Sequence, residues 1–64
     1  MWVEVKKANS LVTAEMWEEL FEGEGIPTRI IPLPGEPRDR EMATYSILVP
    51  KDREHVIQEV LRKL

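Results

Sequence analysis

Cysteine is absent from this chain of 64 residues, and histidine occurs only once. Without cysteine, neither disulfide bonds nor thiolate metal sites can strengthen the fold. The single histidine, His55, has no identifiable acid to orient it, and the serines and threonines have no base to activate them. A glycine-rich phosphate-binding motif is also missing. The sequence therefore predicts a non-enzymatic protein without catalytic residues, metal ions or cofactors.

Long apolar runs and a surplus of positive charge are missing too. No segment is long and apolar enough to span a membrane, and the N-terminus MWVEVKK is too short and too charged for a signal peptide. The 12 acidic residues outnumber the 9 basic ones and give a net charge of −3. This balance argues against nucleic-acid binding, because such binding requires a basic surface. We therefore expect a cytoplasmic protein that binds neither membranes nor nucleic acid.

The length of the chain suffices for one domain, so residues 1–64 are predicted to form a single unit. Domains of this size bury a small share of their surface and are marginally stable alone. A partner subunit would add buried surface. We therefore expect a homodimer.

The first third of the chain predicts a strand and then a helix. Residues 2–8 alternate with period two, which is typical of a strand with one solvated face. One face would carry Val3, Val5 and Lys7, and the other Trp2, Glu4 and Lys6. Ser10 is suited to cap a helix that begins at Leu11. On a helical wheel the apolar side chains fall on one arc, opposite four glutamates: Ala14, Met16, Trp17, Leu20 and Phe21 against Glu15, Glu18, Glu19 and Glu22.

The remainder of the chain predicts two strands and a second helix. Residues 27–31 indicate an edge strand between two prolines, and residues 43–49 give the strongest strand pattern. Asp52 is then expected to cap a last amphipathic helix. The order β-α-β-β-α predicts an α+β fold with a three-stranded antiparallel sheet of order 1-3-2, covered on one face by both helices. This is a truncated ferredoxin-like arrangement, in which the outer edge of the first strand is unpaired.

The stretch ANSLVTAEMWEELFEGEGIPTRI, followed by a polar loop and by YSILVP, resembles a family of small prokaryotic domains assigned to signal transduction. That family has a helix closing in L-E-x-E-G-I-P, whereas this chain has phenylalanine at the first position and an extra glycine, Gly23. The assignment of the family rests on likeness to the nitrogen-regulatory PII proteins, which bind effectors and partner proteins. The resemblance therefore implies a regulatory role, and it brings no catalytic residues with it.

Two regions are candidate binding sites. The uncovered face of the predicted sheet would carry an apolar patch in a polar rim, which suits a contact with a protein partner. We expect this interface, together with the free edge of the first strand, to use Trp2, Glu4, Arg29, Ile31 and Leu48.

The second candidate is the loop at residues 31–41, which is long for so small a protein. Its charged residues are Arg38, Asp39, Arg40 and Glu41. The two arginines, with Arg29 as a possible third, could hold an anionic metabolite, since guanidinium groups bind carboxylates and phosphates in a bidentate manner. The loop could equally be a connector whose charges discourage aggregation. Two functions thus remain open: a protein-interaction module that binds its partner through the edge of the first strand, the open face of the sheet and this loop, and a PII-like sensor of a small anion.

Overall fold

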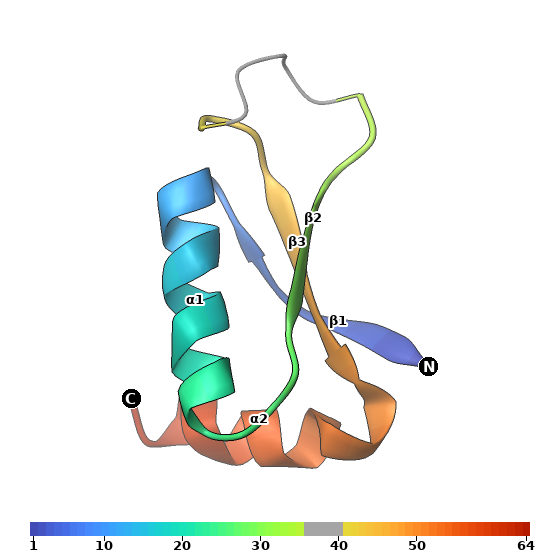
Figure 1. The fold of residues 1–64 in the computed structure, drawn as a ribbon, viewed down its shortest axis with the longest axis vertical. Helices are drawn as coiled ribbons and strands as arrows, with labels where there is room; N and C mark the ends of the chain where they lie inside the picture. Colours follow the sequence, from blue (N-terminus) through green and yellow to red (C-terminus); the bar gives the residue numbers. More distant parts are fainter. Residues whose placement is uncertain (36–40) are drawn as a thin grey trace.

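The computed structural model describes residues 1–35 and 41–64. The chain forms a three-stranded antiparallel sheet of order β1-β3-β2 together with two helices (Figure 1). The elements are β1 (Trp2–Ala8), α1 (Leu11–Gly23), β2 (Arg29–Pro32), β3 (Tyr45–Pro50), the 3-10 turn η1 (Lys51–Arg53) and α2 (Glu54–Arg62). The predicted fold class and strand order are confirmed. Helix α1 runs along one face of the sheet, and α2 crosses beneath the last turn of α1.

Both ends of α1 follow the local rules that the sequence indicated. The Ser10 hydroxyl accepts a hydrogen bond from the Thr13 backbone N–H at 3.2 Å, so Ser10 is the N-cap. At the other end Gly25 adopts a φ of +82°, which side chains strongly disfavour. The Ile26 N–H then donates to the Phe21 carbonyl, and the Gly25 N–H donates to the Glu22 carbonyl. These two bonds form a Schellman motif, which directs the chain from α1 into the sheet.

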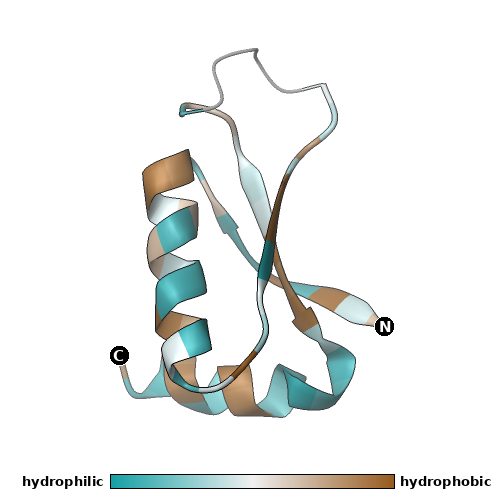
Figure 2. Ribbon diagram, viewed as in Figure 1, coloured by the Kyte–Doolittle hydropathy of each residue, from teal (hydrophilic) through white to brown (hydrophobic). Residues whose placement is uncertain are grey.

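The core lies between the sheet and the two helices. Strand β3 is central and turns Tyr45, Ile47 and Val49 toward the helices, where all three are buried. Phe21 of α1 and Ile57 of α2 meet the same core and are fully buried. Figure 2 shows apolar segments in the strands, and apolar and hydrophilic bands that alternate along both helices.

Strand β1 departs from the predicted alternation because it contains a β-bulge. Glu4 pairs with Leu48 and Lys6 pairs with Ile47, so Val5 is an extra residue with no partner of its own on β3. After the bulge every side chain is turned to the opposite face. Lys6 therefore lies on the helix side, with its Nζ atom 4.7 Å from the centre of the Trp17 ring. Lys7 takes the position on the solvent side that the alternation assigned to Lys6.

Three further details differ from the sequence prediction. Met16 belongs to the apolar arc of α1, yet 58% of its surface is exposed, because no element covers that flank of the helix. Asp52 does not cap α2, since it lies exposed within η1 and no side chain caps that helix. Strand β3 begins at Tyr45, two residues later than predicted, and β2 extends to Pro32.

Candidate functional site

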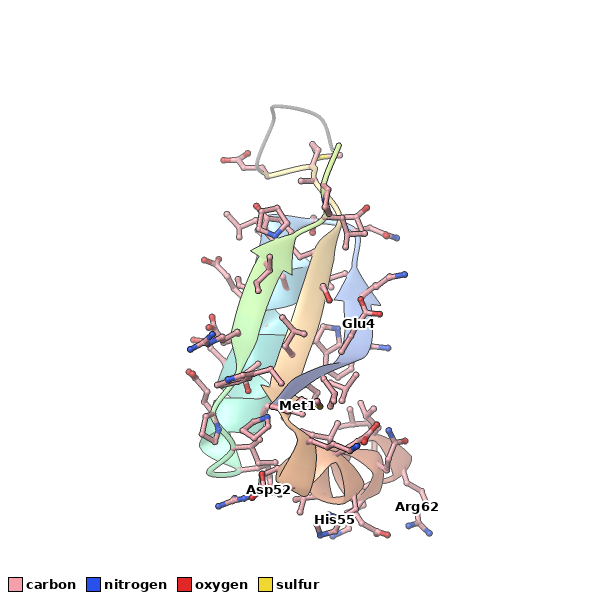
Figure 3. All side chains as sticks on the ribbon, turned by 90° about the vertical axis from the view of Figure 1, so that its right-hand side faces the viewer. Met1, Glu4, Asp52, His55 and Arg62 are labelled. Carbon is pink, nitrogen blue, oxygen red and sulfur yellow. The ribbon has the colours of Figure 1, made fainter. Side chains whose placement is uncertain are left out.

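The side of the sheet that faces away from both helices is exposed, and we call it the open face (Figure 3). The strand register decides which side chains belong to it. Leu48 on the central strand is flanked by Glu4 and Arg29, and Ser46 is flanked by Lys7 and Ile31. Trp2 lies at the end of the same face, opposite Pro50. The open face thus consists of Trp2, Glu4, Lys7, Arg29, Ile31, Ser46 and Leu48.

A cation–π contact crosses the open face between the two outer strands. The guanidinium carbon of Arg29 on β2 lies 4.4 Å from the centre of the Trp2 ring on β1. Because β3 lies between these strands, the pair passes over the central strand. Such a contact contributes about 0.5–1 kcal/mol at an exposed site. It holds the large indole in place on the open face, where the ring remains half-buried.

The acidic side chain of the open face has partners of its own. The Ser46 hydroxyl donates a hydrogen bond to the Glu4 carboxylate over 2.6 Å, and Lys7 Nζ lies 4.0 Å from the other oxygen of that carboxylate. Ser46 is buried by its neighbours, with 8% of its surface exposed. Each charged side chain of this face therefore has a local contact: Glu4 with Ser46 and Lys7, and Arg29 with the Trp2 ring.

An apolar patch remains between these pairs. Ile31 is 46% exposed, and Trp2 and Leu48 are half-buried. The structure thus gathers on one face the five residues that the sequence predicted for an interface: Trp2, Glu4, Arg29, Ile31 and Leu48. Sequence reasoning missed Lys7, because alternation alone gives no sign of the bulge at Val5.

The free edge of β1 carries two features that oppose pairing with another strand. The bulge at Val5 interrupts the regular spacing of backbone groups, and Lys6 points inward from the strand toward Trp17. Edge strands in natural proteins use both devices against edge-to-edge association. The other edge, β2, has four residues and ends at Pro32. Neither edge therefore offers a long regular template.

The second predicted site falls mainly on residues outside the described part of the chain. Arg38, Asp39 and Arg40 lie there. Glu41 is described and exposed, and its carbonyl accepts a hydrogen bond from the Leu11 N–H at 3.0 Å. This bond ties the end of the loop to the first turn of α1. Arg29, the third arginine of the anion hypothesis, lies over Trp2.

The glutamates of α1 form the other marked charge feature. Partial burial raises the pKa of Glu18 above its ordinary value, and repulsion from Glu22, Glu15 and Glu19 raises it further. Among the described residues, no group of three histidine, cysteine or acidic side chains is arranged to hold a metal ion. His55 is exposed on α2 (Figure 3). Within the described part of the chain, no helix is long and apolar enough to cross a membrane.

Comparisons with protein-family models, with curated proteins and with solved structures gave no match.

Proposed function

We propose that this domain is a non-enzymatic protein-interaction module that binds its partner through the open face, and that the first partner is a second copy of the chain. Recognition on this face would need no reacting groups. The resemblance to a signalling family agrees with a regulatory role for such a module.

The observation that carries the proposal is the uncovered apolar patch of Trp2, Ile31 and Leu48 within a rim of paired charges. An apolar centre with a polar rim is the usual anatomy of a protein contact, and tryptophan and arginine are enriched at its energetic centre. The face carries charges of both signs, which favours a second copy, because the acid of one face can meet a base of the other. Two sheets commonly pack face to face in this way.

We place the contact on the face and not on the edge of β1. Edge pairing would require regular backbone groups along the strand, and the bulge at Val5 interrupts them. A face-to-face contact leaves both the bulge and the inward Lys6 undisturbed.

Molar mass by light scattering over a dilution series tests this proposal. We expect the wild type to pass from dimer to monomer on dilution, and Ile31→Ser and Trp2→Ala to remain monomeric at the highest concentration. Met42→Ser is the matched control, because Met42 is an apolar residue that is 66% exposed and belongs to neither the open face nor the helices. It should leave the dimer intact.

A wild type that is monomeric at every concentration would exclude the homodimer. The open face would then be the binding site for a different protein. A dimer that survives both open-face variants would overturn the proposed site.

The sensor of a small anion remains a separate proposal, tied to Arg38 and Arg40. Thermal unfolding with a panel of nucleotides and organic acids tests it. A true ligand at 100 times its dissociation constant should stabilise the fold by about 2.7 kcal/mol. No shift with any compound, together with no effect of Arg38→Ala and Arg40→Ala, would refute the sensor.

A further inference from the structure

The two helices form a groove on the side of the molecule away from the open face. Its volume is about 250 Å³, and its apolar lining comes from Leu20 of α1 and from Val56, Val60 and Leu64 of the α2 region. Leu64 is 72% exposed, so the groove is open at that end.

The apolar surface continues from the groove along α1. Val12 and Met16 precede Leu20 at intervals of four residues, which places the three side chains in one row along the helix. Val12 is 72% exposed and Met16 is 58% exposed, and Figure 2 shows the first turn of α1 as strongly apolar. The row spans about 12 Å, at 1.5 Å per residue. Together the row and the groove form an extended apolar track over two helices.

The charges along the α1 row of this track are negative, whereas those around the groove are of both signs. Helix α1 carries four glutamates and neither lysine nor arginine. Partial burial raises the pKa of Glu18, and repulsion from the neighbouring glutamates raises it further. Within the groove Glu24 adds another acid, and Glu59 is paired with Arg62. Lys63 is the one basic residue among those that line the groove in the described chain.

We propose that this track, formed by Val12, Met16, Leu20, Val56, Val60 and Leu64, docks an amphipathic helix with a basic polar face from a partner protein. The spacing of four residues along α1 matches the ridge of a partner helix, which presents apolar side chains at the same interval. The track offers side chains and no free strand edge, so an extended peptide would gain no main-chain hydrogen bonds there. Lysines or arginines flanking the apolar ridge would meet the glutamates of α1.

The same charges argue against the other occupants. A second copy that docked through this track would bring two acidic α1 surfaces together. An anionic membrane would be repelled for the same reason. The proposal is independent of the open face, because it uses residues on the opposite side of the core.

Fluorescence anisotropy with a labelled synthetic helix tests the proposal. The probe is an 18-residue peptide of leucine and lysine, with leucine at positions i, i+3, i+4 and i+7, and its partner probe has glutamate in place of every lysine. We expect the lysine peptide to bind and the glutamate peptide not to bind. Met16→Ser should weaken binding about tenfold, since the methionine loses apolar contact with the probe. The matched control is Met42→Ser, because Met42 is 66% exposed and lies after the loop.

A basic peptide could also bind to α1 through charge alone. Comparing Met16→Ser with Met42→Ser distinguishes such binding from binding to the apolar track. Binding that is indifferent to Met16→Ser and disappears at high salt would overturn the proposal, since the apolar track would then take no part. The proposal would also be overturned if adding the peptide changed the NMR chemical shifts of backbone amides but not those of Leu20 and Val60. If Met16→Ser dissociates a dimer, the track binds a second copy of the chain. If the wild type sediments with phosphatidylglycerol vesicles and Met16→Ser does not, the track binds a membrane.

Discussion

Both sides of this domain expose apolar side chains, but the two sides differ in how their charges are arranged. On the open face Glu4 contacts both Ser46 and Lys7, and Arg29 contacts Trp2. On α1 the glutamates repel one another and no basic side chain of that helix relieves them. The difference indicates that a face with locally paired charges is suited to its own copy, whereas a face of one sign selects a partner of the opposite sign.

The largest expected effect on stability comes from a substitution in the core, because both sides of the domain are built on the same core. Phe21 is fully buried between α1 and the sheet. Phe21→Ala should lower the free energy of unfolding by about 3–5 kcal/mol, which is most of what a domain of this size possesses. Urea denaturation followed by circular dichroism measures it. Phe21→Leu, which keeps most of the volume, should cost far less; equal losses would show that the site is not tightly packed.

Removing the hydroxyl of Ser46 weakens the paired charges of the open face. We expect Ser46→Ala to cost about 1 kcal/mol, because the Glu4 carboxylate loses its 2.6 Å donor. Denaturant unfolding measures the loss. Glu4→Gln is the comparison variant, since its amide oxygen still accepts from Ser46 and the cost should be smaller. A silent Ser46→Ala would mean that solvent replaces the bond without loss.

Two double-mutant cycles compare the cation–π contact on the open face with the one on the helix side. Trp2→Leu and Arg29→Gln should show a coupling of about 0.5–1 kcal/mol, as expected for a cation over an exposed ring. The matched cycle on the helix side uses Lys6→Gln and Trp17→Leu, and should give a coupling of similar size. Additive variants in either cycle would show that the ring and the cation do not interact there.

The smallest expected effect concerns the repulsion on α1. Glu18→Gln should stabilise the fold at neutral pH by about 0.2–0.5 kcal/mol for each like-charge neighbour relieved, at low salt. The pKa of Glu18 is raised in the folded state, so its proton is held more tightly there. The contribution of this carboxyl to the free energy of unfolding should therefore fall as the pH rises through its folded pKa, and should be fully present below the ordinary value. Thermal unfolding against pH should show a flatter curve for Glu18→Gln, and identical curves would contradict this account.

Much of the fold could be predicted from the sequence because local signals and global packing agree. The cap at Ser10, the left-handed turn at Gly25 and the alternation of β3 all require short stretches of chain only. The bulge at Val5 could not be predicted, since it depends on how β1 pairs with β3. The exposure of Met16 could not be predicted for a related reason: Met16 lies on the apolar arc of α1, but α2 crosses below that flank and leaves it uncovered.

The candidate sites divide in the same way. The five residues predicted for the open face do lie on it, because side chains alternate between the two faces along each strand. Lys7 lies on the same face only because the bulge shifts the alternation of β1. The groove between α1 and α2 had no signature in the sequence, because it arises from the angle at which two separate helices meet.

The two tryptophans of the cation–π contacts can serve as intrinsic fluorescence probes. Trp2 lies on the open face beneath Arg29, and Trp17 lies on the helix side beneath Lys6. The chain has no other tryptophan. Replacing one indole with phenylalanine leaves an emission signal that belongs to one side of the domain alone, so that binding to each face can be followed separately without an added dye.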